Sequence, residues 1–219
     1  MKTRARSLLI IMIAFVEAAA AQDVNTILQK AAEGDAGAQG ELGNMYYTGN
    51  GVRQDYKIAY DWYLKSAEQG VDFAQHALAY MYMYGQGVEM DNSRAIYWFR
   101  KSVAGGYKSS RVYLAILLYN GYAGGEAYHE AFLLIKELSN EMSNDDLWYK
   151  LASMYLEGKG VEINNDSAAF WMIKSAEKGN YNAQYDLSNM YYRGIGVAVD
   201  SVKGNYWRKQ TEEEEYWYY

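Results

Sequence analysis

Residues 38–48 place small and apolar side chains at helical spacing. Ala38, Leu42 and Met45 lie four and three positions apart, so they share one face of a predicted α-helix. Tyr46 continues the same face, and polar residues occupy several positions between these four. The stretch therefore predicts a first helix that packs one side against a core.

A glycine turn and a second helix follow. Gly49-Asn50-Gly51 should end the first helix, because glycine reaches positive φ without steric cost. Asp55 is suited to cap the next helix, from about Tyr56 to Glu68, since its carboxylate accepts backbone N–H bonds. On this second helix, small Ala59 should allow close approach, and Trp62 should fill the space between neighbouring helix pairs. The pattern predicts an antiparallel helix pair.

This helix pair recurs along the chain with a period close to 36 residues, which indicates an architecture of stacked supersecondary repeats. A Gly-x-Gly-Val turn occurs four times, beginning at Gly49, Gly85, Gly158 and Gly194. The period divides the chain into a leading half-repeat at 22–37 and five repeats, at 38–73, 74–109, 110–146, 147–182 and 183–219.

The third repeat, 110–146, is degenerate. Its turn reads GYAGGEA, and Leu134 stands where the other repeats have Trp. Ala127 occupies the N-cap position, which is filled elsewhere by Asp55, Asp91, Asn164 and Asp200. Because alanine has no side-chain acceptor, the second helix of this repeat should begin loosely.

The repeated pattern A-x-x-x-L-G-x-x-Y-x-x-G-x-G-V-x-x-D-x-x-x-A-x-x-W-Y-x-K-x-A-x-x-G resembles the Sel-1-like repeat family, a relative of tetratricopeptide repeats. The resemblance covers about residues 25–216 and is strongest in the first, second, fourth and fifth repeats. It implies an all-α fold, a right-handed α-solenoid of stacked antiparallel helix pairs that serves as an adaptor for protein complexes. Some secreted members are rich in cysteine and linked to penicillin binding, but this chain has no cysteine, so that activity is not carried over.

One face of the predicted first helices is aromatic and apolar. It occupies the positions equivalent to 40, 44 and 47, and its candidate partner-binding residues, here called the first-helix row, are Tyr47, His76, Tyr80, Met83, Ile116, Tyr119, Tyr149, Tyr185 and Tyr192. First helices of such solenoids line the concave surface, and a contiguous apolar surface usually marks a partner site. The alternative is that a tight superhelix buries this face against neighbouring first helices. The sequence leaves both interpretations open.

Residues 1–21 have the pattern of a secretory signal peptide. Lys2, Arg4 and Arg6 precede the apolar run Leu8–Val16, and Ala18–Ala21 offers cleavage sites. The alternative is an uncleaved membrane anchor, but the apolar run is about half as long as the ~20 residues that a bilayer requires. We therefore expect an exported protein, periplasmic or secreted if the host is bacterial as the resemblance suggests. Membrane contact is expected only through an uncleaved leader.

The charge balance argues against nucleic acid as a partner. The net charge of −6 becomes about −8 once Lys2, Arg4, Arg6 and Glu17 are removed with the leader. Clusters of Lys or Arg that would bind phosphates or an anionic membrane surface are absent from the sequence. The lack of cysteine also excludes disulfides, a thiol nucleophile and cysteine metal ligands.

The sequence offers little for catalysis. His76 and His129 lie in different repeats without a metal-ligand pattern. A nucleophile elbow, a P-loop and a dinucleotide fingerprint are all missing. The chain is therefore predicted not to be an enzyme and to need neither a cofactor nor a metal.

The predicted function is an exported adaptor or scaffold that binds a protein or peptide through the concave face. The alternative is a glycan-binding or cell-wall-enzyme accessory protein of the envelope, since exposed Tyr and Trp also stack on sugar rings. At the C-terminus, Glu212–Glu215 are suited to keep the open end of the array soluble. The aromatic tail Tyr216–Tyr219 is expected to fold over that end or to dock elsewhere.

Overall fold

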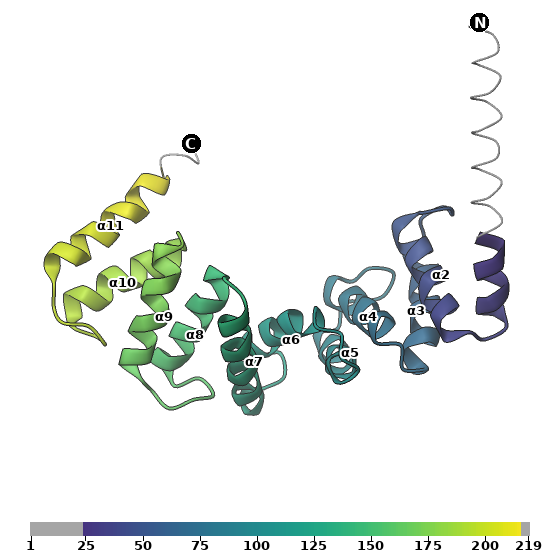
Figure 1. Cartoon of the computed structure of the whole chain (residues 1–219), viewed down its shortest axis with the longest axis horizontal. Helices are drawn as coiled ribbons and strands as arrows, with labels where there is room; N and C mark the ends of the chain where they lie inside the picture. The colour runs from purple at the N-terminus through teal and green to yellow at the C-terminus, as the bar shows by residue number, and fades with distance from the viewer. Residues whose placement is uncertain (1–23, 216–219) are drawn as a thin grey trace, which may run out of the picture. The chain divides into compact units, whose positions relative to one another are not determined.

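A computed structural model describes residues 24–215, and side chains as far as Glu212. The predicted leader and the aromatic tail both lie outside the described residues. Within them every regular element is helical, which confirms the predicted all-α fold. The elements are a helix over residues 24–32, α2 (Ala36–Thr48), α3 (Tyr56–Glu68), α4 (Asp72–Tyr84), α5 (Asn92–Ala104), α6 (Ser110–Tyr119), the 3₁₀ helix η1 (Gly125–Ala127), α7 (Tyr128–Glu141), α8 (Asp145–Glu157), α9 (Asn165–Glu177), α10 (Tyr181–Arg193) and α11 (Ser201–Glu215) (Figure 1).

The described residues divide into two compact bodies, the N-terminal body at 24–111 and the C-terminal body at 112–215. In the N-terminal body α2 packs against α3, α3 against α4, and α4 against α5. In the C-terminal body the same succession runs from α7 through α8, α9 and α10 to α11. Each body is thus a stack of helix pairs in which a second helix contacts the first helix of the next repeat.

The second helices begin where the sequence predicts. Helix α3 spans Tyr56–Glu68, and Oδ1 of Asp55 accepts from the backbone N of Lys57 and Ile58 at 2.9 and 3.0 Å. The equivalent residues Asp91, Asn164 and Asp200 cap α5, α9 and α11 in the same way. These caps satisfy backbone donors that would otherwise lack a partner at the helix start.

Four of the first helices, α2, α4, α8 and α10, begin two residues before the predicted repeat boundaries, whereas α6 begins at its boundary, Ser110. Helix α2 starts at Ala36 rather than Ala38, because Asp35 is its N-cap and accepts from the N of Ala38 at 2.7 Å. The next repeat has no acidic residue at this position. Val71 stands there and makes no side-chain cap bond. Asn144 and Asn180 cap α8 and α10 from the same repeat position, so a capping side chain recurs there in three of the five repeats.

The second helix of the degenerate repeat begins without a capping side chain. Ala127 makes no side-chain cap bond, and the 3₁₀ turn η1 leads directly into α7. The N of Ala127 instead bonds to the carbonyl of Gly124 at 3.2 Å. A backbone turn thus replaces the capping side chain.

The core follows the predicted pattern of small and large residues. The leucine of each first helix and the alanine of the first four second helices are 0 to 2% exposed, namely Leu42, Leu78, Leu114, Leu151 and Leu187 with Ala59, Ala95, Ala131 and Ala168. Because these alanines have almost no side chain, the two helices of a pair can approach closely. Full burial of such leucines stabilises a protein by about 1.5–3 kcal/mol each.

A buried glutamine links consecutive helix pairs. Nε2 of Gln39, Gln75 and Gln184 donates to the carbonyl oxygen of Ala31, Ala67 and Ala176, respectively, at 3.1 to 3.2 Å. In the fourth repeat Trp148 takes this position, and its Nε1 donates to the carbonyl of Ser139 at 2.9 Å. The indole N–H thus replaces the amide N–H as the donor across the repeat boundary, and neither group is left buried without a partner.

The second glycine of the turn allows one repeat to touch the backbone of the repeat before it. Gly87 has φ +70°, and a Cβ placed on it would lie 2.2 Å from the carbonyl oxygen of Tyr56, the first residue of α3. Gly160 stands in the same relation to Tyr128, the first residue of α7. Glycine is required here by the close backbone approach as well as by the dihedral angle.

Candidate functional site

The first-helix row is half-buried, between the two alternatives that the sequence left open. In the N-terminal body Tyr47, His76, Tyr80 and Met83 are partly exposed. In the C-terminal body Ile116, Tyr119 and Tyr149 are partly exposed, while Tyr185 and Tyr192 are 43% and 38% exposed. These side chains therefore keep one side toward solvent instead of being sealed between neighbouring helices.

Three row residues of the N-terminal body meet in a pocket of about 220 Å³, here called the tyrosine pocket. It lies between the first helices α2 and α4, and its lining residues are Asn44, Tyr47, Tyr63, His76, Ala77 and Tyr80. Tyr63 comes from the second helix α3 and belongs to the buried core. It is 3% exposed and forms part of the pocket wall. Its position beside the repeated Trp62 gave no signal for this second role.

The aromatic rings of the tyrosine pocket are held at an angle to one another. The ring centroids of Tyr47 and Tyr63 are 6.4 Å apart, with an interplanar angle of 57°. The hydroxyl of Tyr47 donates to Oε1 of Gln86 at 2.8 Å, which fixes its direction. Burial raises the pKa of both phenols, so both stay neutral at physiological pH. The lining contains no Asp, Glu, Lys or Arg.

His76 is positioned by a chain of hydroxyl groups. Ser102 Oγ donates to the carbonyl of Asp72 and Ser110 Oγ donates to Ser102 Oγ, both at 2.7 Å. The hydroxyl proton of Ser110 is thereby used, so Nδ1 of His76 donates to Ser110 Oγ across 2.9 Å. Burial lowers the pKa of His76 and keeps the imidazole neutral at pH 7. The tyrosine pocket is therefore uncharged.

A second pocket, of about 280 Å³, lies between α8 and α10 of the C-terminal body and is here called the acidic pocket. It occupies the corresponding repeat positions, and its lining residues are Tyr149, Ser153, Leu156, Glu157, Asp186, Asn189, Met190, Arg193 and Ile195. Tyr149 is the one first-helix row residue in this set. The charged members occupy the repeat positions equivalent to 41 and 48. These positions lie beside the predicted aromatic face at 40, 44 and 47, so the sequence pattern gave no signal for them.

Tyr149 and Asp186 form the polar centre of the acidic pocket. The Tyr149 hydroxyl donates to Oδ2 of Asp186 at 3.1 Å. Burial raises the pKa of Tyr149 to about 12, with a smaller contribution from the charge of Asp186. Burial also raises the pKa of Asp186 above its ordinary value, and the Tyr149 hydrogen bond opposes this shift. Burial thus makes the charged form of Asp186 less favourable than it is in water, and a nearby cation would offset that cost.

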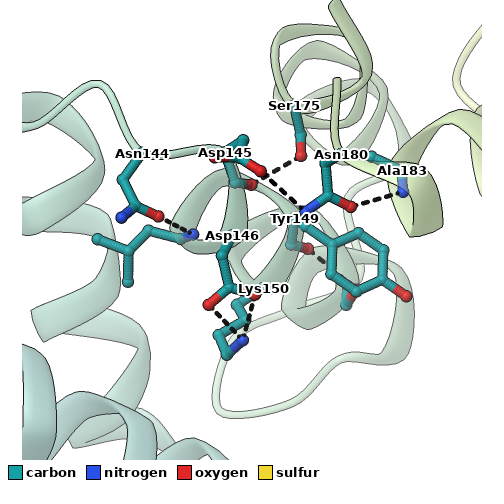
Figure 2. Close-up of polar contacts among 10 residues, drawn as sticks. Asn144, Asp145, Asp146, Tyr149, Lys150, Ser175, Asn180 and Ala183 are labelled. Atoms are coloured by element: carbon teal, nitrogen blue, oxygen red, sulfur yellow. Dashed lines mark hydrogen bonds and ion pairs between the residues drawn. The ribbon is translucent and has the colours of Figure 1, made fainter. Parts of the chain in front are cut away.

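Polar contacts link the N-termini of α8 and α10. Figure 2 shows Asn180 between Asp145 and Ala183, where its Nδ2 donates to Asp145 Oδ2 at 3.2 Å and its Oδ1 accepts from the N of Ala183 at 2.9 Å. One turn into α8, Nζ of Lys150 pairs with Asp146 at 2.6 Å (Figure 2). The Asn180 bond thus joins the start of α10 to the start of α8, whereas the Lys150–Asp146 pair lies within α8.

The other row residues contact neighbouring side chains and line neither pocket. The Lys159 ammonium lies 4.2 Å from the ring centroid of Tyr119, whose pKa is raised by burial. The Arg208 guanidinium lies 4.2 Å from the Tyr185 ring, and its hydrogen bond lowers the pKa of Tyr185. Tyr192 donates to Oδ1 of Asn205 at 2.6 Å. Met83 and Ile116 are half-buried without a polar role.

The structure also exposes an aromatic position on the second helices that sequence reasoning missed. Here called the outer row, it comprises Tyr97, Leu133, Phe170 and Tyr206, which are 51 to 56% exposed. Three of these residues pack edge-on against the tryptophan that follows them, with centroids 5.0 to 5.1 Å apart. The signal in the sequence was an aromatic residue directly before the tryptophan in three repeats, at Trp98, Trp171 and Trp207.

Metal ligands do not converge anywhere in residues 24–215, where groups of three or more His, Cys, Asp or Glu side chains at ligand distance are absent. His129 donates from Nδ1 to the carbonyl of Gly160 at 2.8 Å, which is a structural contact. In the same part of the chain, every helix is too short or too polar to cross a bilayer.

The sequence profile of the Sel1 repeat matches residues 36–71, 72–107, 149–180 and 182–209, which together make up more than half of the chain. The degenerate third repeat lies outside these matches. Among curated proteins, no sequence is detectably similar.

Two solved structures show the same fold. A protective antigen present in uropathogenic Escherichia coli strains, displaying an SLR fold, is 32% identical with a TM-score of 0.67. That comparison covers 89% of this chain and 42% of the antigen, so the chain spans less than half of the antigen's length. A Sel1 repeat protein from Oxalobacter formigenes is 27% identical with a TM-score of 0.68, over 94% of this chain and 84% of that one. Consecutive repeats of the Sel1 type thus account for the stacked helix pairs.

Proposed function

The chain belongs to the Sel1 repeat family, and we propose that it is an exported adaptor that binds a protein or peptide through the first-helix row and performs no chemistry of its own. Proteins of this family are typically protein–protein interaction modules. One observation carries the proposal. Both pockets lie between the first helices of consecutive repeats, at corresponding positions, and both include residues of the row.

The chemistry of the row suits a peptide partner. Half-buried tyrosines are rigid anchors that offer an apolar ring together with a hydroxyl group, and a few such residues typically carry most of the energy of an interface. Their cost in conformational entropy on binding is low, because Tyr47 and Tyr149 are already fixed by hydrogen bonds to Gln86 and Asp186. The row is therefore preorganised for contact.

A site-specific crosslinking experiment tests this proposal. A photoreactive phenylalanine derivative replaces Tyr80 on the row in one strain and Tyr97 on the outer row in another. We expect light to join a discrete partner to the Tyr80 position and not to the Tyr97 position, which is 51% exposed and serves as a matched control. Crosslinking of the same partner only at Tyr97 would place the interface on the second helices and refute the proposal.

Export belongs to the proposal and rests on the sequence pattern of residues 1–21. N-terminal sequencing of the protein purified from its host should give a first residue near Gln22. An intact Met1 in a membrane fraction would contradict cleavage and indicate an anchor.

Glycan binding in the cell envelope is the second candidate, and the outer row favours it. Tyr97, Phe170 and Tyr206 expose apolar ring surface on which sugar rings can stack. Titration with soluble peptidoglycan fragments tests this candidate directly. Saturable binding that is abolished by Tyr97→Ser, Phe170→Ser and Tyr206→Ser together, and not by changes in the first-helix row, would favour it over a peptide partner.

A further inference from the structure

The acidic pocket contains a carboxylate that the described residues satisfy only in part. Asp186 is half-buried, and its hydrogen bond in the structure is the one from Tyr149 to Oδ2. A carboxylate has about four acceptor positions, so a bound donor can be accommodated. Removal from water without a cation is unfavourable for this group, which is why burial raises its pKa. A cationic ligand would relieve that cost.

The walls of the acidic pocket match a side chain that is apolar along its stem and charged at its end. Leu156, Met190 and Ile195 supply apolar surface, and the ring of Tyr149 adds an aromatic face. Asp186 supplies the anionic group among them. Arginine and lysine bury their methylene stems against apolar surface in this way while the charged group pairs with a carboxylate.

The distribution of charge along the chain points in the same direction. Residues 24–111 contain nine acidic and nine basic side chains and are neutral overall. Residues 112–215 contain sixteen acidic and nine basic side chains, a net charge of −7. Around the acidic pocket, the lining carboxylates are Glu157 and Asp186, and the lining cation is Arg193, which is exposed at the end of α10. The C-terminal body therefore attracts basic ligands to its surface.

We propose that the acidic pocket binds an arginine or lysine side chain of a peptide partner, with the carboxylate of Asp186 as the ion-pairing group. This rests on the proposed function, because it specifies the chemistry of the partner for one part of the same surface. The tyrosine pocket has no charged lining residue and so takes an uncharged side chain. The two pockets therefore differ in the kind of side chain that each would accept.

Binding of a minimal probe to the isotope-labelled full chain, followed by NMR, tests the proposal. N-acetyl-arginine methylamide is compared with N-acetyl-citrulline methylamide, which has the same shape and no charge. We expect saturable shifts at α8 and α10 residues for the arginine probe and at least tenfold weaker binding of the citrulline probe. Equal binding of the two probes would overturn the proposal.

Two variants assign the effect to one carboxylate. Asp186→Asn keeps an oxygen that can accept the Tyr149 hydroxyl and removes the charge, so the arginine probe should bind at least tenfold more weakly. Glu162→Gln removes an exposed charge that does not line the pocket and should change binding less than twofold. Unchanged arginine binding to Asp186→Asn would refute the assignment.

A measurement on the unaltered protein covers the case in which Asp186→Asn does not fold. The carboxyl ¹³C signal of Asp186 is titrated with and without the arginine probe, and the probe should lower its pKa. An unmoved pKa at saturating probe would refute the ion pair. If these tests fail while crosslinking at Tyr80 succeeds, only this inference is refuted. If crosslinking at Tyr80 fails, the proposed function is refuted.

Discussion

Replacement of Gly87 by alanine tests how consecutive repeats fit together. Gly87 has φ +70°, and a Cβ there would lie 2.2 Å and 2.4 Å from the carbonyl oxygen and carbon of Tyr56 and 2.9 Å from the N of Lys57. All three are backbone atoms at the start of α3, which cannot move as a flexible side chain can. Gly70 is the matched control, with φ +93° and no atom within 4 Å of the added carbon.

The expected magnitudes follow from two separate costs. A non-glycine residue at positive φ costs about 1–2 kcal/mol, and both variants carry this cost. Forcing extra volume into a packed contact costs about 1–3 kcal/mol more, and only Gly87→Ala carries it. We expect Gly70→Ala to lower the free energy of unfolding by about 1–2 kcal/mol and Gly87→Ala by about 2–5 kcal/mol.

Urea denaturation monitored by circular dichroism and tryptophan fluorescence measures both losses in the same body of the protein. Since helix content should be the same at zero denaturant, the difference lies in the midpoint of the transition. Equal losses for Gly70→Ala and Gly87→Ala would show that the dihedral angle alone requires glycine. The close contact between the turn and the preceding repeat would then carry no stability.

Three further predictions concern the core and the two pockets. Trp98→Ala should lower stability more than Trp207→Ala, because Trp98 is 8% exposed in the second of the five repeats, whereas Trp207 is half-buried in the last. Equal urea midpoints for the two variants would contradict an array in which each repeat is stabilised by its neighbours. The pKa of His76 is lower in the folded protein than in the unfolded chain. Stability should therefore fall as the pH drops below the unfolded pKa near 6.5, and level off below the folded pKa. His76→Gln should flatten that part of a pH–stability curve, and an unchanged slope would show that His76 does not cause the loss. Asp186 has a folded pKa above its unfolded value, so its charge opposes folding at neutral pH; Asp186→Asn should raise the melting temperature at pH 7 and not at pH 3, and a lower melting temperature at pH 7 would show that the carboxylate is structural.

Local chemistry explains why the second helices could be predicted so closely. Asp55 caps α3 and a glycine in a left-handed conformation ends α2, and both effects depend on residues adjacent in sequence. The first-helix starts were less predictable, because Asp35 and Val71 occupy the same repeat position with different chemistry. A repeated pattern shows what the repeats share and omits what one repeat does differently.

Contacts between repeats could not be predicted from the sequence for a different reason. Trp148 looks like a substitution of the buried glutamine, and only the geometry shows that its indole N–H donates to Ser139 as the amide does elsewhere. Tyr63 lies beside a repeated tryptophan in the sequence, and only the structure shows that it forms a wall of the tyrosine pocket. The position of the first-helix row could be read from spacing, but the charge of Asp186 in its pocket depends on two helices distant in sequence.

The central claim is that the first-helix row serves binding and the repeat-frame residues serve folding. Tyr47→Ser, Tyr80→Ser and Tyr119→Ser are combined in one variant, and Tyr82→Ser is the control, since Tyr82 is 3% exposed and its hydroxyl lies 2.7 Å from that of Tyr60. The measurement is the affinity for the crosslinked partner, alongside the free energy of unfolding of each variant. We predict that the triple variant keeps its helicity and loses at least about 30-fold in affinity, since one aromatic anchor is worth about 2 kcal/mol, while Tyr82→Ser loses about 3–5 kcal/mol of stability. A triple variant that unfolds while Tyr82→Ser stays folded, or one that folds and binds normally, would contradict the claim.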